Sequence, residues 1–100
     1  MKIPKQIKIG GFMFNVKESK QIAIEGNGYG STHHTTQTIY IDPDSTPQKK
    51  EQTFLHEMMH GIWNQVGLNK REYTHKQEEE IIDALSHGLY QVLKDNKLLK

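Results

Sequence analysis

Apolar and polar residues alternate along the first part of the chain. Residues 5–9 and 12–16 each follow this pattern, and Gly10-Gly11 separates the two segments. Alternation with a period of two is typical of a strand with one buried face, and two glycines suit a tight turn, so we expect a β-hairpin. Residues 21–25 alternate more briefly and residues 36–41 are rich in β-branched side chains, which predicts two further strands.

The spacing of apolar residues becomes helical in the second half of the chain, which predicts two amphipathic helices. The first is expected to begin after a cap at Ser45 or Thr46 and to end near Val66, where Gly67 can adopt the left-handed conformation. The second is expected to cover about residues 76–94. Its apolar stripe consists of Ile81, Ile82, Leu85, Leu89, Val92 and Leu93.

These elements predict an α+β fold in which a small, mostly antiparallel sheet of three or four strands precedes two long helices. A chain of 100 residues has the size of one domain, and its apolar content of 34% allows a small core. We therefore expect residues 1–100 to form a single domain, with the sheet in residues 1–44 and the two helices in residues 45–96.

Composition narrows the classes of partner and of metal site. The formal net charge is +1, whereas proteins that bind nucleic acid or anionic membranes usually have a strong basic bias, so neither is expected as a partner. No long apolar run is present, which predicts a cytoplasmic protein without a membrane span. The chain also has no cysteine, so a transition-metal site would have to use histidine and carboxylate ligands.

The first predicted helix contains the pattern His56-Glu57-x-x-His60. Residues four apart lie one turn apart on the same face of a helix, so the two imidazoles could bind one zinc ion. Glu57 could then take a proton from a water molecule bound to that ion. So short a pattern also occurs by chance. The alternative is an amphipathic helix whose histidines bind no metal.

A catalytic zinc site usually has three protein ligands, and the acidic run Glu78-Glu79-Glu80 offers the third. Two helices joined by a short loop pack antiparallel, which brings the start of the second helix towards the first. Glu78 is in line with the apolar stripe and Glu79 lies beside it, so the stripe does not choose between them. The spacing Glu79-x-x-x-Asp83 favours Glu79 as the ligand, with Asp83 accepting a hydrogen bond from a ligand histidine. The alternative for this run is a solvated acidic first turn.

A polar segment separates the glycine-rich stretch 26–30 from the strand predicted at 36–41. The glycines resemble a phosphate-binding loop, but no helix follows them, so a turn is the better interpretation. Residues 31–36 predict a polar strand at a sheet edge, which is a candidate platform for an extended peptide. His33 and His34 could indicate a second metal site, but solvated positions at the sheet edge explain them better.

The pattern His56-Glu57-Met58-Met59-His60, followed after eighteen residues by Glu79-Glu80-Ile81-Ile82-Asp83, resembles the gluzincin metallopeptidases, whose third ligand belongs to a Glu-x-x-x-Asp helix. The run from residue 37 to residue 96 is similar to small phage- and prophage-encoded metallopeptidases that are grouped loosely with the ImmA/IrrE-like proteins. The resemblance covers roughly residues 30–96. It implies a minimal zincin-like fold and peptidase activity.

The resemblance and the motif together give the hypothesis of a zinc-dependent peptidase. His56, His60 and Glu79 would bind Zn²⁺, and Glu57 would be the catalytic base. The resemblance also implies that an edge strand lines the cleft above the motif helix. The residues of that strand expected to bind a peptide substrate are Thr32, His33, His34, Thr35 and Thr36.

Two points remain open in this hypothesis. Tyr73 and His75, in the predicted loop between the helices, are candidates for stabilising the transition state. The alternative to a peptidase is a non-catalytic function, in which a zinc-stabilised module binds a protein partner or regulator through the edge strand. Glu57 would then be dispensable, and a fourth protein ligand would close the zinc site. A small domain without metal is a third possibility. The sequence favours a peptidase that acts on a peptide or protein as a monomer or weak dimer.

Overall fold

The computed structural model, which describes residues 1–26 and 28–99, contains a four-stranded sheet followed by two long helices. This arrangement confirms the predicted α+β class. The elements are β1 (Gln6–Ile9), β2 (Phe12–Glu18), α1 (Lys20–Glu25), β3 (Gly30–His33), β4 (Thr38–Ile41), α2 (Pro47–Gln65), the 3-10 helix η1 (Leu68–Lys70) and α3 (His75–Asp95).

The sheet is mixed, with the strand order β1-β2-β4-β3. β1 and β2 form the predicted hairpin, in which Ile9 lies opposite Phe12. β4 pairs parallel with β2 and antiparallel with β3, so two of the three pairings are antiparallel. β3 is an edge strand, and within the described part of the chain its outer side pairs with no other strand.

The strand predicted for residues 21–25 is wrong, because this segment forms most of α1. The side chain of Ser19 accepts a hydrogen bond from the backbone nitrogen of Ile22 at 3.4 Å and thereby caps the helix. Ala23 is buried, whereas Ile24 points outwards with 56% of its surface exposed. Two isoleucines at alternate positions are too few to distinguish a strand from a helix, and the cap at Ser19 decides between them.

The polar segment is also shorter as a strand than predicted. β3 ends at His33, and a turn over residues 34–37 separates it from β4, which begins at Thr38. Gln37 closes this turn with a φ of 50°. Of the turn predicted at residues 26–30, Gly28 has the positive φ that such a turn requires, and Asn27 lies outside the described residues.

Both long helices begin and end close to their predicted bounds. The Thr46 hydroxyl accepts the N–H of Lys49 at 3.2 Å and caps α2, and Gly67 follows the helix with a φ of 84°. Thr74 caps α3 through a reciprocal pair of hydrogen bonds with Gln77. In the described residues, no helix combines the length and the apolar character that crossing a lipid bilayer requires.

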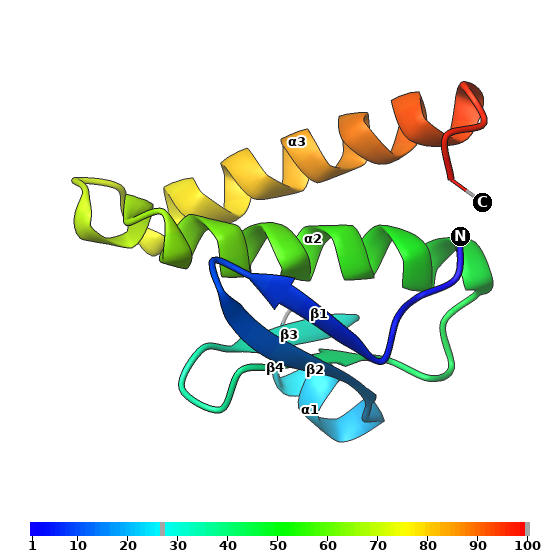
Figure 1. Ribbon diagram of the computed structural model, residues 1–100, viewed down its shortest axis with the longest axis horizontal. Coiled ribbons are helices and arrows are strands. Elements are labelled where there is room, and N and C mark those ends of the chain that lie inside the picture. Colours follow the sequence, from blue (N-terminus) through cyan, green and yellow to red (C-terminus); the bar gives the residue numbers. More distant parts are fainter. Residues whose placement is uncertain (27, 100) are drawn as a thin grey trace.

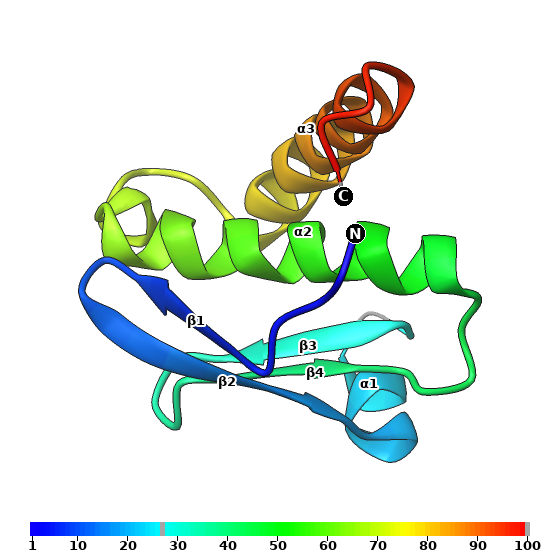
Figure 2. The same cartoon turned by 45° about the vertical axis from the view of Figure 1, so that its right-hand side comes forward.

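α2 lies across one face of the sheet, and α3 packs against the side of α2 that faces away from the sheet (Figure 1). Figure 2 shows α1 on the opposite side of the sheet from α2. The core between the sheet and α2 is apolar and buried, so α2 is held firmly in place. This core consists of Ile9, Phe14, Ile39, Ile41 and Phe54.

Glu51, buried in α2 between the start of the helix and the histidine motif, connects α2 to α3 and to the N-terminus. Its Oε1 atom accepts a hydrogen bond from the Tyr90 hydroxyl at 2.9 Å and lies 3.5 Å from Lys94 Nζ. Its Oε2 atom lies 2.7 Å from the amine of Met1. Hydrogen bonding to that amine and to Tyr90 holds the pKa of Glu51 below its usual range, although burial acts in the opposite direction. These contacts fix the C-terminal half of α3 on α2.

Gly30 begins β3 at a point where the strand passes close to α2. A Cβ atom there would lie 2.6 Å from Thr53 Cγ2 and 2.9 Å from the Tyr40 carbonyl oxygen. We therefore expect Gly30→Ala to lower the free energy of unfolding by about 1–3 kcal/mol. The control is Gly88→Ala, since Gly88 lies in α3 with open space around it. That change should raise the free energy of unfolding by about 0.5–1 kcal/mol. Denaturant unfolding measures the free energy of unfolding of both variants. Equal changes for Gly30→Ala and Gly88→Ala would contradict the close approach of β3 to α2 at Gly30.

Candidate metal centre

One turn of α2 places the two motif histidines side by side. His56 and His60 are both buried, with exposed fractions of 7% and 6%, and their ring centroids are 4.9 Å apart. Their Nε2 atoms are separated by 3.2 Å. Phe54, which belongs to the core between α2 and the sheet, holds this turn against the sheet. The two rings therefore direct their Nε2 atoms to a common point.

α3 brings a carboxylate to the same point. Glu79 Oε1 lies 2.9 Å from His60 Nε2, and Glu79 Oε2 lies 3.4 Å from His56 Nε2. One ligand atom from each of these residues, here called the metal group, lies within 4.8 Å of the other two. A tetrahedral site with metal–ligand bonds of about 2.0–2.1 Å has ligand atoms roughly 3.3–3.4 Å apart, so the metal group has a suitable size.

The outer nitrogen of each ring faces a group of α3. His60 Nδ1 donates a hydrogen bond to Glu78 Oε2 at 2.6 Å, which leaves a lone pair on His60 Nε2. His56 Nδ1 lies 3.4 Å from Ser86 Oγ and 3.7 Å from Asp83 Oδ1. With the His56 proton also on Nδ1, both Nε2 atoms present a lone pair. Three electron-pair donors then face one another, which is unfavourable unless a cation lies between them. The donor set therefore fits a divalent metal ion.

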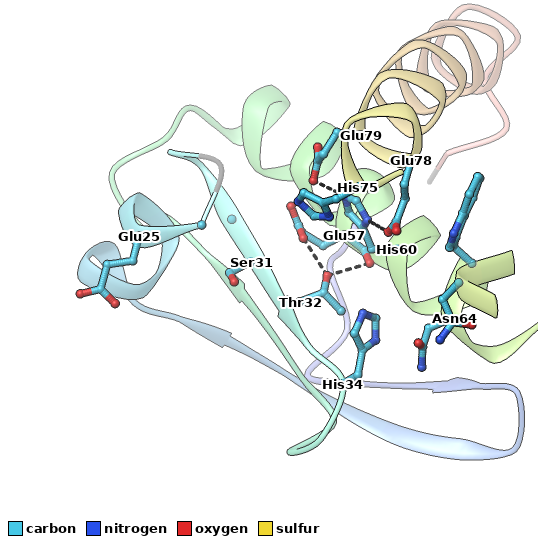
Figure 3. A pocket seen from close by; sticks show the side chains of 14 residues that line it. Glu25, Ser31, Thr32, His34, Glu57, His60, Asn64, His75, Glu78 and Glu79 are labelled. Carbon is cyan, nitrogen blue, oxygen red and sulfur yellow. Dashed lines mark hydrogen bonds and ion pairs between the residues drawn. The ribbon is translucent and has the colours of Figure 1, made fainter. Parts of the chain in front are cut away.

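Glu57 approaches the metal group from the side of the sheet, and 2% of its surface is exposed. The Thr32 hydroxyl lies 2.7 Å from Glu57 Oε1 and 2.9 Å from the Glu57 carbonyl oxygen (Figure 3). Glu57 Oε2 lies 4.0 Å from His56 Nε2. Burial raises the pKa of Glu57 above its ordinary value, although the hydrogen bond from Thr32 acts in the opposite direction. A buried carboxylate near the metal group is a suitable proton acceptor.

A cleft of about 710 Å³, here called the main cleft, lies between β3 and the start of α3. Glu57, His60 and Glu79 line it from one side, and Thr32 lines it from β3. Figure 3 shows these side chains facing the same space. Because the outer edge of β3 pairs with no other strand in the described residues, its backbone groups can pair with an extended chain in this cleft.

The five residues predicted to bind the substrate differ in position. Thr32 and His33 belong to β3, whereas His34, Thr35 and Thr36 belong to the following turn and cannot extend the strand. Thr32 and His34 line the main cleft, and the other three residues do not. Burial lowers the pKa of His34, against a smaller opposing effect from a nearby glutamate. The predicted platform is therefore limited to β3 and to the first residue of the turn.

The two residues suggested for transition-state stabilisation, Tyr73 and His75, also lie in different places relative to the main cleft. His75, the first residue of α3, lines the main cleft. Tyr73 does not line it and instead packs edge-on against Trp63, with ring centroids 5.1 Å apart. Of these two candidates, the structure places only His75 where it can reach a bound chain.

Sequence reasoning missed two side chains that orient the site. Glu78 was open as an alternative ligand, but its carboxylate binds the outer nitrogen of His60 and not the common point. Its position in line with Ile82 was a usable signal, since it directs the side chain towards α2. Thr32 was expected to contact substrate, yet its hydroxyl binds Glu57. Pairing between a strand residue and a helix residue leaves no signal in a single sequence.

The comparisons with known proteins agree with this geometry. The family model that describes the IrrE N-terminal-like domain, a peptidase family, matches residues 15–89, which is three quarters of the chain. The matched range contains the metal group, Glu57 and Thr32. No curated protein and no solved structure matches the chain.

Three adjacent glutamates allow a matched test of the metal group. We expect Glu79→Ala to abolish tight metal binding and Glu78→Ala to weaken it by about 10–100-fold, as observed for residues that orient a ligand histidine. Glu80 is exposed and pairs with Lys76 at 3.9 Å, so Glu80→Ala should leave the affinity unchanged. Competition with a fluorescent chelator gives the three dissociation constants. A loss for Glu80→Ala as large as that for Glu79→Ala would contradict the assignment.

Proposed function

The chain belongs to the family of the IrrE N-terminal-like domain, and we propose that it is a zinc-dependent peptidase. The observation that carries the proposal is the convergence of the metal group beside Glu57, in a cleft bordered by an open strand edge. Family membership supports a metallopeptidase. The identity of the metal and the residue roles below are inferences from geometry and donor chemistry.

The donor set supports zinc as the metal. Two imidazole nitrogens and one carboxylate oxygen form the usual ligand set of a catalytic zinc site in which one position stays open. Among the described residues, no further histidine or carboxylate joins the three residues of the metal group with a ligand atom within 4.8 Å of all the others. This supports an open, hydrolytic site over a closed structural one. A non-catalytic zinc module, the alternative function, would instead require the fourth position to be filled by protein.

When bound, the metal would polarise the scissile carbonyl and lower the pKa of a coordinated water molecule. Glu57 would be the residue that accepts a proton from the attacking water and returns it to the leaving amine. Thr32 holds one carboxylate oxygen of Glu57, so the other oxygen remains directed towards the metal group. Glu78 and Asp83 orient the two histidine rings from the outer side.

The edge of β3 supplies the substrate-binding part of the proposal. An extended peptide paired with the outer edge of β3 would pass over Glu57 and the metal group, because residues of β3 and the metal group line the same cleft. His75 and His34 line that cleft and are the candidates for hydrogen bonding to the oxyanion that forms during hydrolysis.

Zinc content and the dependence of hydrolysis on Glu57 test this proposal. The chain, purified without a histidine tag, should contain about one zinc ion per molecule, and a chelator should remove both the zinc and the hydrolysis. Glu57→Gln keeps the shape of the side chain but removes its basicity. It should retain zinc and lose hydrolysis of a quenched fluorescent peptide library by about 10²–10⁴-fold.

Glu80→Ala is the matched control, because Glu80 is exposed, pairs with Lys76 at 3.9 Å and does not line the main cleft. It should leave both zinc content and hydrolysis unchanged. A wild-type chain without zinc would refute the proposal. Full hydrolysis by Glu57→Gln would refute the role of Glu57, and zinc binding without any hydrolysis would favour the binding module.

A further inference from the structure

A second, smaller hollow of about 180 Å³ lies on the other side of Glu79 and is here called the side hollow. Glu79 lines both the main cleft and the side hollow. The main cleft meets the metal group at His60, whereas the side hollow meets it at His56. A chain bound across the metal group would therefore place a neighbouring group in the side hollow.

Lys49 is the basic residue of this region. Among the described residues that line either hollow, it is the one lysine or arginine. Its Nζ atom lies 4.1 Å from the centre of the Tyr29 ring and 3.5 Å from Gln52 Oε1, and both of these residues also line the side hollow. Stacking on an aromatic ring holds the ammonium group in position without neutralising its charge.

The charge of Lys49 is not balanced by a protein carboxylate. In the described part of the chain, no Asp or Glu oxygen lies within 4.0 Å of its Nζ atom, whereas the adjacent Lys50 pairs with Glu18 at 3.3 Å. Both lysines lie in the first turn of α2, where the helix dipole favours anions and disfavours cations. Lys49 thus has no carboxylate partner and is available to an anionic ligand.

Two carboxylates also line the side hollow. Glu79 faces the two histidine nitrogens of the metal group. Asp83 lies 3.7 Å from His56 Nδ1, and most of its side chain is exposed to solvent. Lys49 is the cationic group that the side hollow offers to a ligand.

We propose that the side hollow is a substrate subsite for a carboxylate group next to the cleaved bond, with Lys49 as the residue that determines this specificity. The inference rests on the proposed peptidase function and adds a substrate class to it. The volume of the side hollow is large enough for a short acidic group, and its lysine supplies the preference for a negative charge. The carboxylate can belong to an Asp or Glu side chain or to the end of the substrate chain.

Three small hydroxamic acids test the subsite without requiring hydrolysis. Their hydroxamate anchors each to zinc, and their arms have similar lengths but end in a carboxylate, a neutral amide or an ammonium group: succinic monohydroxamate, its amide and 4-aminobutanoic hydroxamate. On the zinc-loaded chain, the carboxylate arm should bind about five- to tenfold more tightly than the amide, and the ammonium arm should bind most weakly, since one charge-assisted hydrogen bond separates them. Isothermal titration calorimetry gives the three affinities.

Two variants of adjacent lysines give the matched comparison. Lys49→Glu should reverse the order of the carboxylate and ammonium arms, and Lys50→Glu should preserve it. Lys49→Met keeps most of the aliphatic stem and should make the three affinities nearly equal. Equal affinities for the wild type, an unchanged order in Lys49→Glu, or failure of all three compounds to bind the zinc-loaded chain would overturn the subsite.

A peptide library distinguishes the two possible sources of the carboxylate. It also tests the subsite separately from the peptidase function. Cleavage beside Asp or Glu in peptides with blocked ends would identify a side chain, and a requirement for a free C-terminus would identify the chain end. Charge-selective hydroxamate binding by a chain that cleaves no peptide would refute the peptidase function but retain the subsite. Cleavage without any preference for a carboxylate would refute the subsite alone.

Discussion

The structure depends on the approach of three electron-pair donors from two helices. His56, His60 and Glu79 direct one atom each to a common point, and Glu78 holds the His60 ring from its outer side. Without a cation, these donors repel each other. Bound metal would therefore link α3 to α2, and its binding free energy would add to the stability of the fold. The link through the metal matters because α3 buries few side chains of its own: among its described residues, Ile82 and Ser86 are the buried ones.

The sheet contributes to the same site through one close contact. Gly30 lets β3 pass near α2, and this approach allows the Thr32 hydroxyl to reach Glu57. The strand that can bind an extended chain is thus joined directly to the residue proposed as the base. The anchoring of α3 at both ends, by Glu51 at one and by the metal group at the other, sets the width of the cleft.

The sequence predicted the parts of this protein that depend on local periodicity and spacing. The motif helix, its Thr46 cap and its end before Gly67 are confirmed, as is the hairpin around Gly10-Gly11. The convergence of Glu79 with the histidines followed from the expected antiparallel helices. Whether these residues act as proposed remains a prediction.

Other features lay beyond a single sequence. Residues 21–25 alternate as a strand would, and the helix that they form depends on the Ser19 cap and on burial of Ala23. The contacts of Thr32 with Glu57 and of Lys49 with Tyr29 join residues more than nineteen positions apart, so they depend on the tertiary arrangement. The same holds for the parallel pairing of β2 with β4, which α1 makes possible by carrying the chain across the sheet.

The coordination shell of zinc in the loaded chain tests the central claim most directly. X-ray absorption spectroscopy of the wild-type chain measures the number and type of zinc ligands, and metal analysis of the Glu79→Ala variant shows whether zinc is retained. We predict two imidazole nitrogens and two oxygens at about 2.0–2.2 Å in the wild type, and loss of the bound zinc in the variant. A shell with more than two imidazoles, or a Glu79→Ala variant that retains its zinc, would contradict the account.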